Sequence, residues 1–96
     1  MKLFKEEIIV TAEVEDGAKW EQGFRTHGDL FKSQSINNPI QFSISGDNEV
    51  VICFEADDVE KYVGDLESPA TIEAMTIDGV KRDTVKVRVL DKEFDL

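Results

Sequence analysis

The sequence is poor in several residue types on which particular folds and chemistries depend. Among its 96 residues are one cysteine, one histidine, one tryptophan, one tyrosine and two prolines. The single thiol, Cys53, excludes a disulfide within the chain. No stretch approaches the ~20 apolar residues that a membrane-spanning helix needs, and the charged first residues leave no apolar core for a signal peptide. The sequence therefore predicts a soluble, cytoplasmic protein.

Basic residues are also scarce, with 11 Lys and Arg against 21 Asp and Glu, and the net charge is −10. Such an acidic chain repels phosphate backbones and anionic lipids, so neither nucleic acid nor a membrane surface is an expected partner. The hydrophobic fraction of 41% is nevertheless that of a globular protein. We expect one domain over residues 1–96. Because so short a domain buries only ~60–65% of its unfolded surface, self-association would enlarge its core.

Motifs for metals, phosphates and dinucleotides are absent from the sequence. There is no glycine-rich phosphate loop, no zinc pattern and no dinucleotide fingerprint, so neither a cofactor nor a metal is predicted. Carboxylates that flank two predicted strands are expected to gather at one end of the sheet, where their oxygens could bind a hard cation. These residues are Glu13, Glu15, Asp16, Glu55, Asp57 and Asp58. The alternative, favoured because no calcium-loop spacing is present, is that they cap helices and stay solvated.

An aromatic stripe over residues 18–31 organises the rest of the sequence. Trp20, Phe24, His27 and Phe31 are spaced at i, i+4, i+7 and i+11, which places them on one face of an α-helix. Polar residues occupy most of the positions between them. The sequence therefore predicts one continuous helix whose aromatic face packs against the rest of the protein.

Alternating apolar and polar residues predict four strands, and two further segments have helical periodicity. The predicted strands cover residues 8–14, 40–45, 49–55 and 84–90, and the later helical segments cover residues 59–66 and 69–78. A faint internal repeat relates residues 14–20 to residues 56–62, with acids, a lysine and an aromatic residue at matching offsets. This order predicts a ferredoxin-like α+β fold, βαββαβ, in which the helices cover one face of a four-stranded antiparallel sheet with the first and third strands at its centre.

The opposite face of the predicted sheet is too apolar at its centre for water alone and too polar for an ordinary core. It presents Ile9, Thr11, Gln41, Ser43, Val51, Cys53, Lys86 and Arg88. Sheet faces pack at ~10 Å and two-fold homodimers are the commonest oligomers, so we expect a homodimer through this face. Lys86 and Arg88 would then pair with acids across the dimer or, alternatively, hold an anionic substrate. Phe94 and Leu96 indicate a C-terminal extension that packs on another surface.

Several of these residues together resemble a known superfamily. Lys19-Trp20, Phe24 and His27 look like the first helix of dimeric α+β barrel proteins. The likeness continues in Asn48-Glu49-Val50-Val51-Ile52, Phe54-Glu55, Ser68-Pro69, Glu73-Ala74-Met75 and Gly79-Val80. It implies two four-stranded sheets paired into a dimeric barrel. The superfamily includes cofactor-free monooxygenases of the antibiotic-biosynthesis type, polyketide cyclases, haem-binding enzymes, stress-response proteins and members without an assigned activity. The Asn, Trp and His placements typical of the monooxygenase and haem-degrading members are not matched here.

The candidate site is a pocket under the aromatic helix. Histidine is suited to acid–base chemistry near neutral pH, which makes His27 the predicted catalytic residue. Trp20, Phe24, Tyr62 and Met75 are predicted to line an apolar ligand-binding pocket beside it. The alternative is that His27 is a half-buried packing residue and that the aromatic residues are plain core.

Three functions are compatible with these residues. In the first, the protein binds a small apolar or aromatic ligand without strong catalysis. In the second, it is a cofactor-independent monooxygenase or a polyketide-cyclase-like enzyme that uses His27 as acid or base. In the third, the dimer is purely a structural assembly module. A cavity beside Trp20 and His27 would favour the first two, and a filled core the third. Cys53 is expected to be an inert thiol rather than a nucleophile, because no base is predicted beside it.

Overall fold

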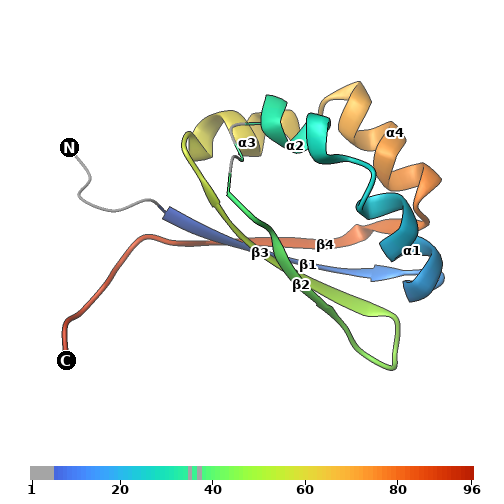
Figure 1. Cartoon of the computed structure of the whole chain (residues 1–96), viewed down its shortest axis with the longest axis horizontal. Coiled ribbons are helices and arrows are strands. Elements are labelled where there is room, and N and C mark those ends of the chain that lie inside the picture. The colour runs from blue at the N-terminus through green and yellow to red at the C-terminus, as the bar shows by residue number, and fades with distance from the viewer. Residues whose placement is uncertain (1–5, 35, 37) are drawn as a thin grey trace.

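The computed structural model describes residues 6–34, 36 and 38–96, and in this part of the chain four helices cover one face of a four-stranded antiparallel sheet (Figure 1). The elements are β1 (Glu6–Val14), α1 (Gly17–Phe24), α2 (Gly28–Ser33), β2 (Gln41–Ile44), β3 (Glu49–Ala56), α3 (Val59–Asp65), α4 (Pro69–Ile77) and β4 (Val80–Leu90). The strand order is β2-β3-β1-β4, with every neighbouring pair antiparallel. The predicted ferredoxin-like α+β fold, with the first and third strands at the centre, is therefore confirmed.

The core lies between the sheet and the helices, and strand alternation explains which side chains reach it. Ile8 of β1 pairs with Phe54 of β3 on one side and with Val89 of β4 on the other. Ile8 and Val50 are almost completely buried. The helices therefore rest on an aliphatic surface supplied by the central strands. No helix in the described part of the chain is long and apolar enough to cross a membrane.

The aromatic segment is not one continuous helix, and that prediction is wrong. After Arg25 the backbone amides bond three rather than four residues back: Thr26 N–H donates to the Gly23 carbonyl at 3.0 Å, and His27 N–H donates to the Phe24 carbonyl at 3.1 Å. The Thr26 hydroxyl also donates to the Gly23 carbonyl, at 2.6 Å. A hydroxyl that binds the backbone competes with helical hydrogen bonds, and the glycines beside this break lower helix propensity. His27 therefore lies at the N-terminal end of α2.

The carboxylates do not gather at one end of the sheet, and that prediction is also wrong. Strands β1 and β3 run antiparallel, so Glu55 pairs with Glu7 at the start of β1, whereas Glu13 lies near its end. The capping alternative is confirmed at both helices that follow the central strands. Asp16 accepts hydrogen bonds from the second and third backbone amides of α1, and Asp58 accepts one from α3. Among the described residues no cluster of three metal-ligating side chains is present.

The face of the sheet away from the helices is only partly open to solvent in the single chain. Its central side chains are half-buried, namely Ile9, Thr11, Val51 and Cys53. Its flanking side chains are exposed, namely Gln41, Ser43, Lys86 and Arg88. Beyond β4, residues 91–96 form neither helix nor strand and extend away from the sheet (Figure 1).

Candidate functional site

A cavity of about 80 Å³ lies between the helical layer and the sheet. Side chains from all four helices and from β1, β3 and β4 line it, and most of them are apolar. The five residues predicted for the site all belong to this lining: Trp20, Phe24, His27, Tyr62 and Met75. The core beneath the aromatic segment is therefore not completely filled.

Aromatic rings contribute to the lining and pack against further rings behind it. Trp20 and Phe24 lie one turn apart on α1 and stack with ring centroids 4.5 Å apart. Phe42 of β2 packs edge-on against both rings. Tyr62 of α3 packs edge-on against Phe54, and burial raises the pKa of its phenol far above the ordinary value. Tyr62 is therefore neutral in the folded protein at any physiological pH.

His27 has a carboxylate partner that the sequence did not reveal. Its Nε2 lies 3.0 Å from Oδ2 of Asp78, the residue that ends α4. The Asp78 side chain is only 7% exposed and that of His27 is 23% exposed, so the pair is shielded on one side and accessible on the other. A carboxylate can only accept a hydrogen bond, so Nε2 carries the proton of the neutral imidazole and Nδ1 is left as the basic nitrogen.

Space for the Asp78 carboxylate is provided by a glycine. A β-carbon built on Gly23 of α1 would lie 1.9 Å from Oδ1 of Asp78. The two helices therefore approach each other at a point where only a hydrogen atom fits. The sequence gives little indication of the His27–Asp78 pair. Asp78 has the pattern of a helix end before Gly79, and it is 51 residues from His27.

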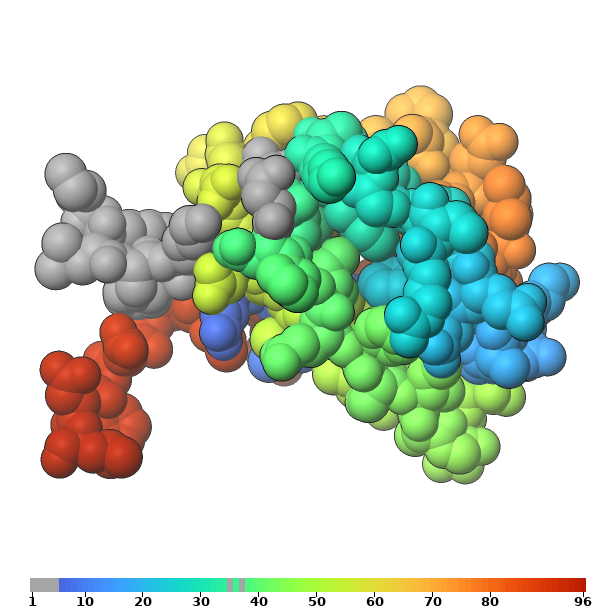
Figure 2. All heavy atoms as spheres, viewed as in Figure 1, coloured from blue at the N-terminus to red at the C-terminus, as the bar shows by residue number. Residues whose placement is uncertain are grey.

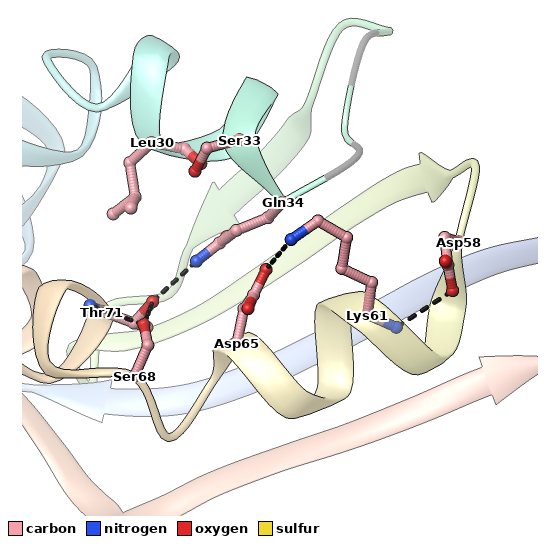
Figure 3. Close-up of polar contacts among 8 residues, drawn as sticks. All are labelled: Leu30, Ser33, Gln34, Asp58, Lys61, Asp65, Ser68 and Thr71. Carbon is pink, nitrogen blue, oxygen red and sulfur yellow. Dashed lines mark hydrogen bonds and ion pairs between the residues drawn. The ribbon is translucent and has the colours of Figure 1, made fainter.

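A second polar pair lines the cavity and joins α2 to α4 (Figure 3). Gln34 Nε2 donates to Thr71 Oγ1 at 2.6 Å, and both residues are buried. Ser68 Oγ donates to Thr71 Oγ1 at 3.0 Å and accepts from the Thr71 backbone amide, as the N-cap of α4. The sequence analysis missed this pair, because Thr71 becomes the partner of Gln34 only through the packing of the two helices.

Cys53, Lys86 and Arg88 lie on the far face of the sheet and do not reach the cavity. Burial, together with the Glu7 and Glu55 carboxylates, raises the pKa of the Cys53 thiol. A raised pKa keeps the thiol protonated, which is the behaviour expected of an inert cysteine and not of a nucleophile.

Comparisons with known proteins identify the fold. No protein-family model and no curated protein sequence matches the chain. A provisionally named antibiotic biosynthesis monooxygenase from Bordetella bronchiseptica superposes with a TM-score of 0.71 at 16% identity, over 93% of this chain and 97% of that one. SnoaB, a cofactor-independent oxygenase from Streptomyces nogalater, superposes with a TM-score of 0.67 at 18% identity, over 97% of this chain and 98% of that one. The ActVA-Orf6 monooxygenase of Streptomyces coelicolor, crystallised with nanaomycin D, superposes with a TM-score of 0.60 at 14% identity, over 96% of this chain and 90% of that one. The chain therefore has the ferredoxin-like α+β fold of these solved structures, which is the subunit fold that the resemblance found in the sequence implied.

Proposed function

We propose that the protein binds a small apolar or aromatic compound in the cavity and acts on it by acid–base chemistry through His27. The observation that carries this proposal is the His27–Asp78 pair, with Nε2 and Oδ2 3.0 Å apart, in the wall of a mostly apolar cavity. A buried carboxylate holds the imidazole in one tautomer and stabilises the imidazolium that forms when Nδ1 accepts a proton. An apolar pocket with a few placed polar groups is the usual form of a small-molecule site.

The lining and the volume of the cavity limit what it can take. None of the described residues that line it is Lys or Arg, so an anionic ligand would lose its hydration without gaining a cation. A neutral ligand is therefore favoured. A cavity of ~150 Å³ holds benzene, so a space of about 80 Å³ takes a compound with an aromatic ring only if the helical layer moves outward. The layer consists of short helices, with breaks between α1 and α2 and between α3 and α4.

The reaction class that fits best is oxygenation without a cofactor. Proton removal by His27 from an activated methylene group would leave an electron-rich carbanion that dioxygen can oxidise. Oxidation of the methylene to a carbonyl keeps one oxygen atom of O2 in the product and releases the other as water with the two hydrogens. Two structural neighbours are an oxygenase described as cofactor-independent and a monooxygenase, which supports this class over a cyclase.

Binding without catalysis is the second candidate function. It is supported by the same cavity, whereas a purely structural module would be expected to fill its core at this position. We further propose that the protein forms a homodimer through the open face of the sheet. Ile9, Thr11, Val51 and Cys53 are half-buried there within a single chain, and a second sheet would complete their burial.

Native mass spectrometry of freshly purified protein tests stoichiometry and retained ligand together. Trp20, the chain's single tryptophan, then reports on binding by its fluorescence during titration with phenol or hydroquinone. The matched variant is Ala74→Leu, which fills the cavity from α4 and should weaken a saturable signal about tenfold or more. With a substrate in hand, His27→Ala should still bind but lose oxygen consumption. Unchanged turnover in His27→Ala would contradict the catalytic function and leave binding as the function. If the protein neither shows saturable binding nor retains a ligand, both the catalytic and the binding function are excluded.

A further inference from the structure

The last six residues form an extended arm with exposed apolar side chains. Residues 91–96, the C-terminal arm, have no regular secondary structure and project from the body of the protein (Figures 1 and 2). Phe94 is 82% exposed, and Leu96 is fully exposed. A benzyl side chain left in water forgoes the free energy that burial of its apolar surface would provide. The arm therefore gains stability from any surface that covers Phe94.

A groove on the helical side of the protein has the matching chemistry. It has a volume of about 440 Å³ and runs between the α1–α2 segment and β2, which we name the helix–β2 groove. Phe24, Phe31 and Phe42 form an aromatic cluster in it. The centroid of the Phe24 ring lies 5.1 Å from that of Phe31 and 5.4 Å from that of Phe42. Arg25 and Lys32 also line it, and the Arg25 guanidinium lies 5.2 Å above the Phe42 ring while its Nε bonds to Glu21.

Charge distinguishes this groove from the rest of an acidic protein. The chain has a net charge of −10, yet the described residues that line the groove include two cations and no carboxylate. The C-terminal arm has the opposite character, because Asp91, Glu93 and Asp95 outnumber Lys92. Opposite charges around an aromatic contact favour correct docking and suppress other partners.

We propose that the C-terminal arm of one copy of this chain docks in the helix–β2 groove of a second copy, with Phe94 against the aromatic cluster and the flanking acids beside Arg25 and Lys32. The proposed chemistry in the cavity does not require this interface.

Docking within one chain is disfavoured by the topology. The arm leaves from β4, at the opposite edge of the sheet from β2, and it points away from the helices (Figure 1). Three strand spacings amount to ~14 Å, and six extended residues span at most ~20 Å. Most of the arm would therefore be used in crossing the sheet. Each copy has one arm and one groove, so a two-fold pair satisfies both at once.

Photo-crosslinking of the full chain tests the interface. Phe94 is replaced by p-benzoylphenylalanine, and isotope-labelled and unlabelled chains are mixed so that crosslinks between copies can be distinguished by mass. We expect crosslinks between copies that map to Phe31, Lys32 or Phe42. Crosslinks found only within one copy, or mapped to the open sheet face, would overturn the proposal.

Two glycines provide a matched pair of blocking variants. A β-carbon on Gly28 of α2 or on Gly64 of α3 meets nothing within 4 Å, so each position has open space at the point where a side chain begins. Gly28 lines the groove and Gly64 does not. Gly28→Leu should therefore reduce crosslinking between copies about tenfold, as loss of a central interface contact does, and Gly64→Leu should leave it unchanged. Equal crosslinking in both variants, with circular dichroism confirming that both are folded, would contradict the proposal.

Discussion

Gly23 and Asp78 are in such close contact that a single methyl group on the glycine would overlap the carboxylate, with 1.9 Å between the added carbon and Oδ1. This contact places Asp78 where it meets His27, and it gives the candidate site a dependence on a residue that carries no functional group.

Gly23→Ala should displace the Asp78 carboxylate and separate it from His27. We expect a loss of about 1–3 kcal/mol in the free energy of unfolding, the usual cost of overpacking, and a change in the His27 ring signals in the NMR spectrum. Gly64→Ala is the control, because its β-carbon meets nothing within 4 Å and alanine favours a helix. A Gly23→Ala protein with unchanged stability and unchanged ring signals would show that the contact does not constrain the site.

Asp78→Asn should preserve the shape of the site but remove the charge that fixes the His27 tautomer. If His27 is the base, turnover should fall by about 10²-fold or more while ligand binding is retained. Oxygen consumption and Trp20 fluorescence measure the two effects separately. Asp65→Asn breaks an exposed ion pair with Lys61 and should change neither. Equal losses of binding and turnover in Asp78→Asn would instead indicate a structural role.

Tyr62 should make the protein sensitive to alkali. Burial raises its pKa in the folded state, so the folded chain binds the phenolic proton more tightly than the unfolded chain does. The resulting stability is complete below the unfolded value of about 10 and is lost as the pH rises above it. Denaturant unfolding on either side of that pH measures the change, and phenolate absorbance reports on the chain's single tyrosine. Tyr62→Phe should show a smaller loss, and an equal loss in both proteins would exclude Tyr62 as its source.

The Gln34–Thr71 hydrogen bond should couple α2 to α4. Gln34→Leu and Thr71→Val each remove one partner, and each single variant should lose about 1–3 kcal/mol because the other group is left buried and unsatisfied. The double variant should lose less than the sum of the two. Chemical denaturation of all four proteins gives a coupling free energy, expected to be about 1 kcal/mol. A coupling of zero would mean that the two side chains contribute to stability independently.

Cys53 should react slowly with alkylating reagents, and the rate should depend on protein concentration. Its raised pKa lowers the thiolate fraction in the folded chain relative to the unfolded chain. If a second copy covers the open sheet face, alkylation slows further as the protein is concentrated. A rate that is constant with concentration while the protein remains dimeric would place the dimer interface elsewhere.

The sequence predicted the features that depend on local pattern and failed where tertiary packing decides. Period-two alternation was enough to identify the central strands, and Ser68-Pro69 marked the start of α4 correctly. The stripe of Trp20, Phe24 and His27 did identify residues that share one cavity. Its continuity was overestimated, because periodicity is insensitive to a threonine hydroxyl that binds the backbone.

The wrong prediction and the two polar pairs that were not predicted have a common physical origin. The carboxylate cluster was predicted wrongly because the antiparallel pairing of β1 and β3 places the two acidic groups at opposite ends of the sheet. Asp78 and Gln34 were missed because each finds its partner on another helix, Asp78 at a separation of 51 residues and Gln34 at 37. Neither the composition nor the residue spacing predicts such a contact, because it depends on how the helices pack on the sheet.

Phe24 and Phe31 line the cavity on one side and the helix–β2 groove on the other. Two rings thus serve as a partition between an interior space and an external one. An occupant of either space would contact that partition, so the free energy of filling one can depend on whether the other is filled. Thermodynamic linkage requires any such effect to be reciprocal: the factor by which a docked arm alters ligand affinity must equal the factor by which ligand alters the affinity for the arm.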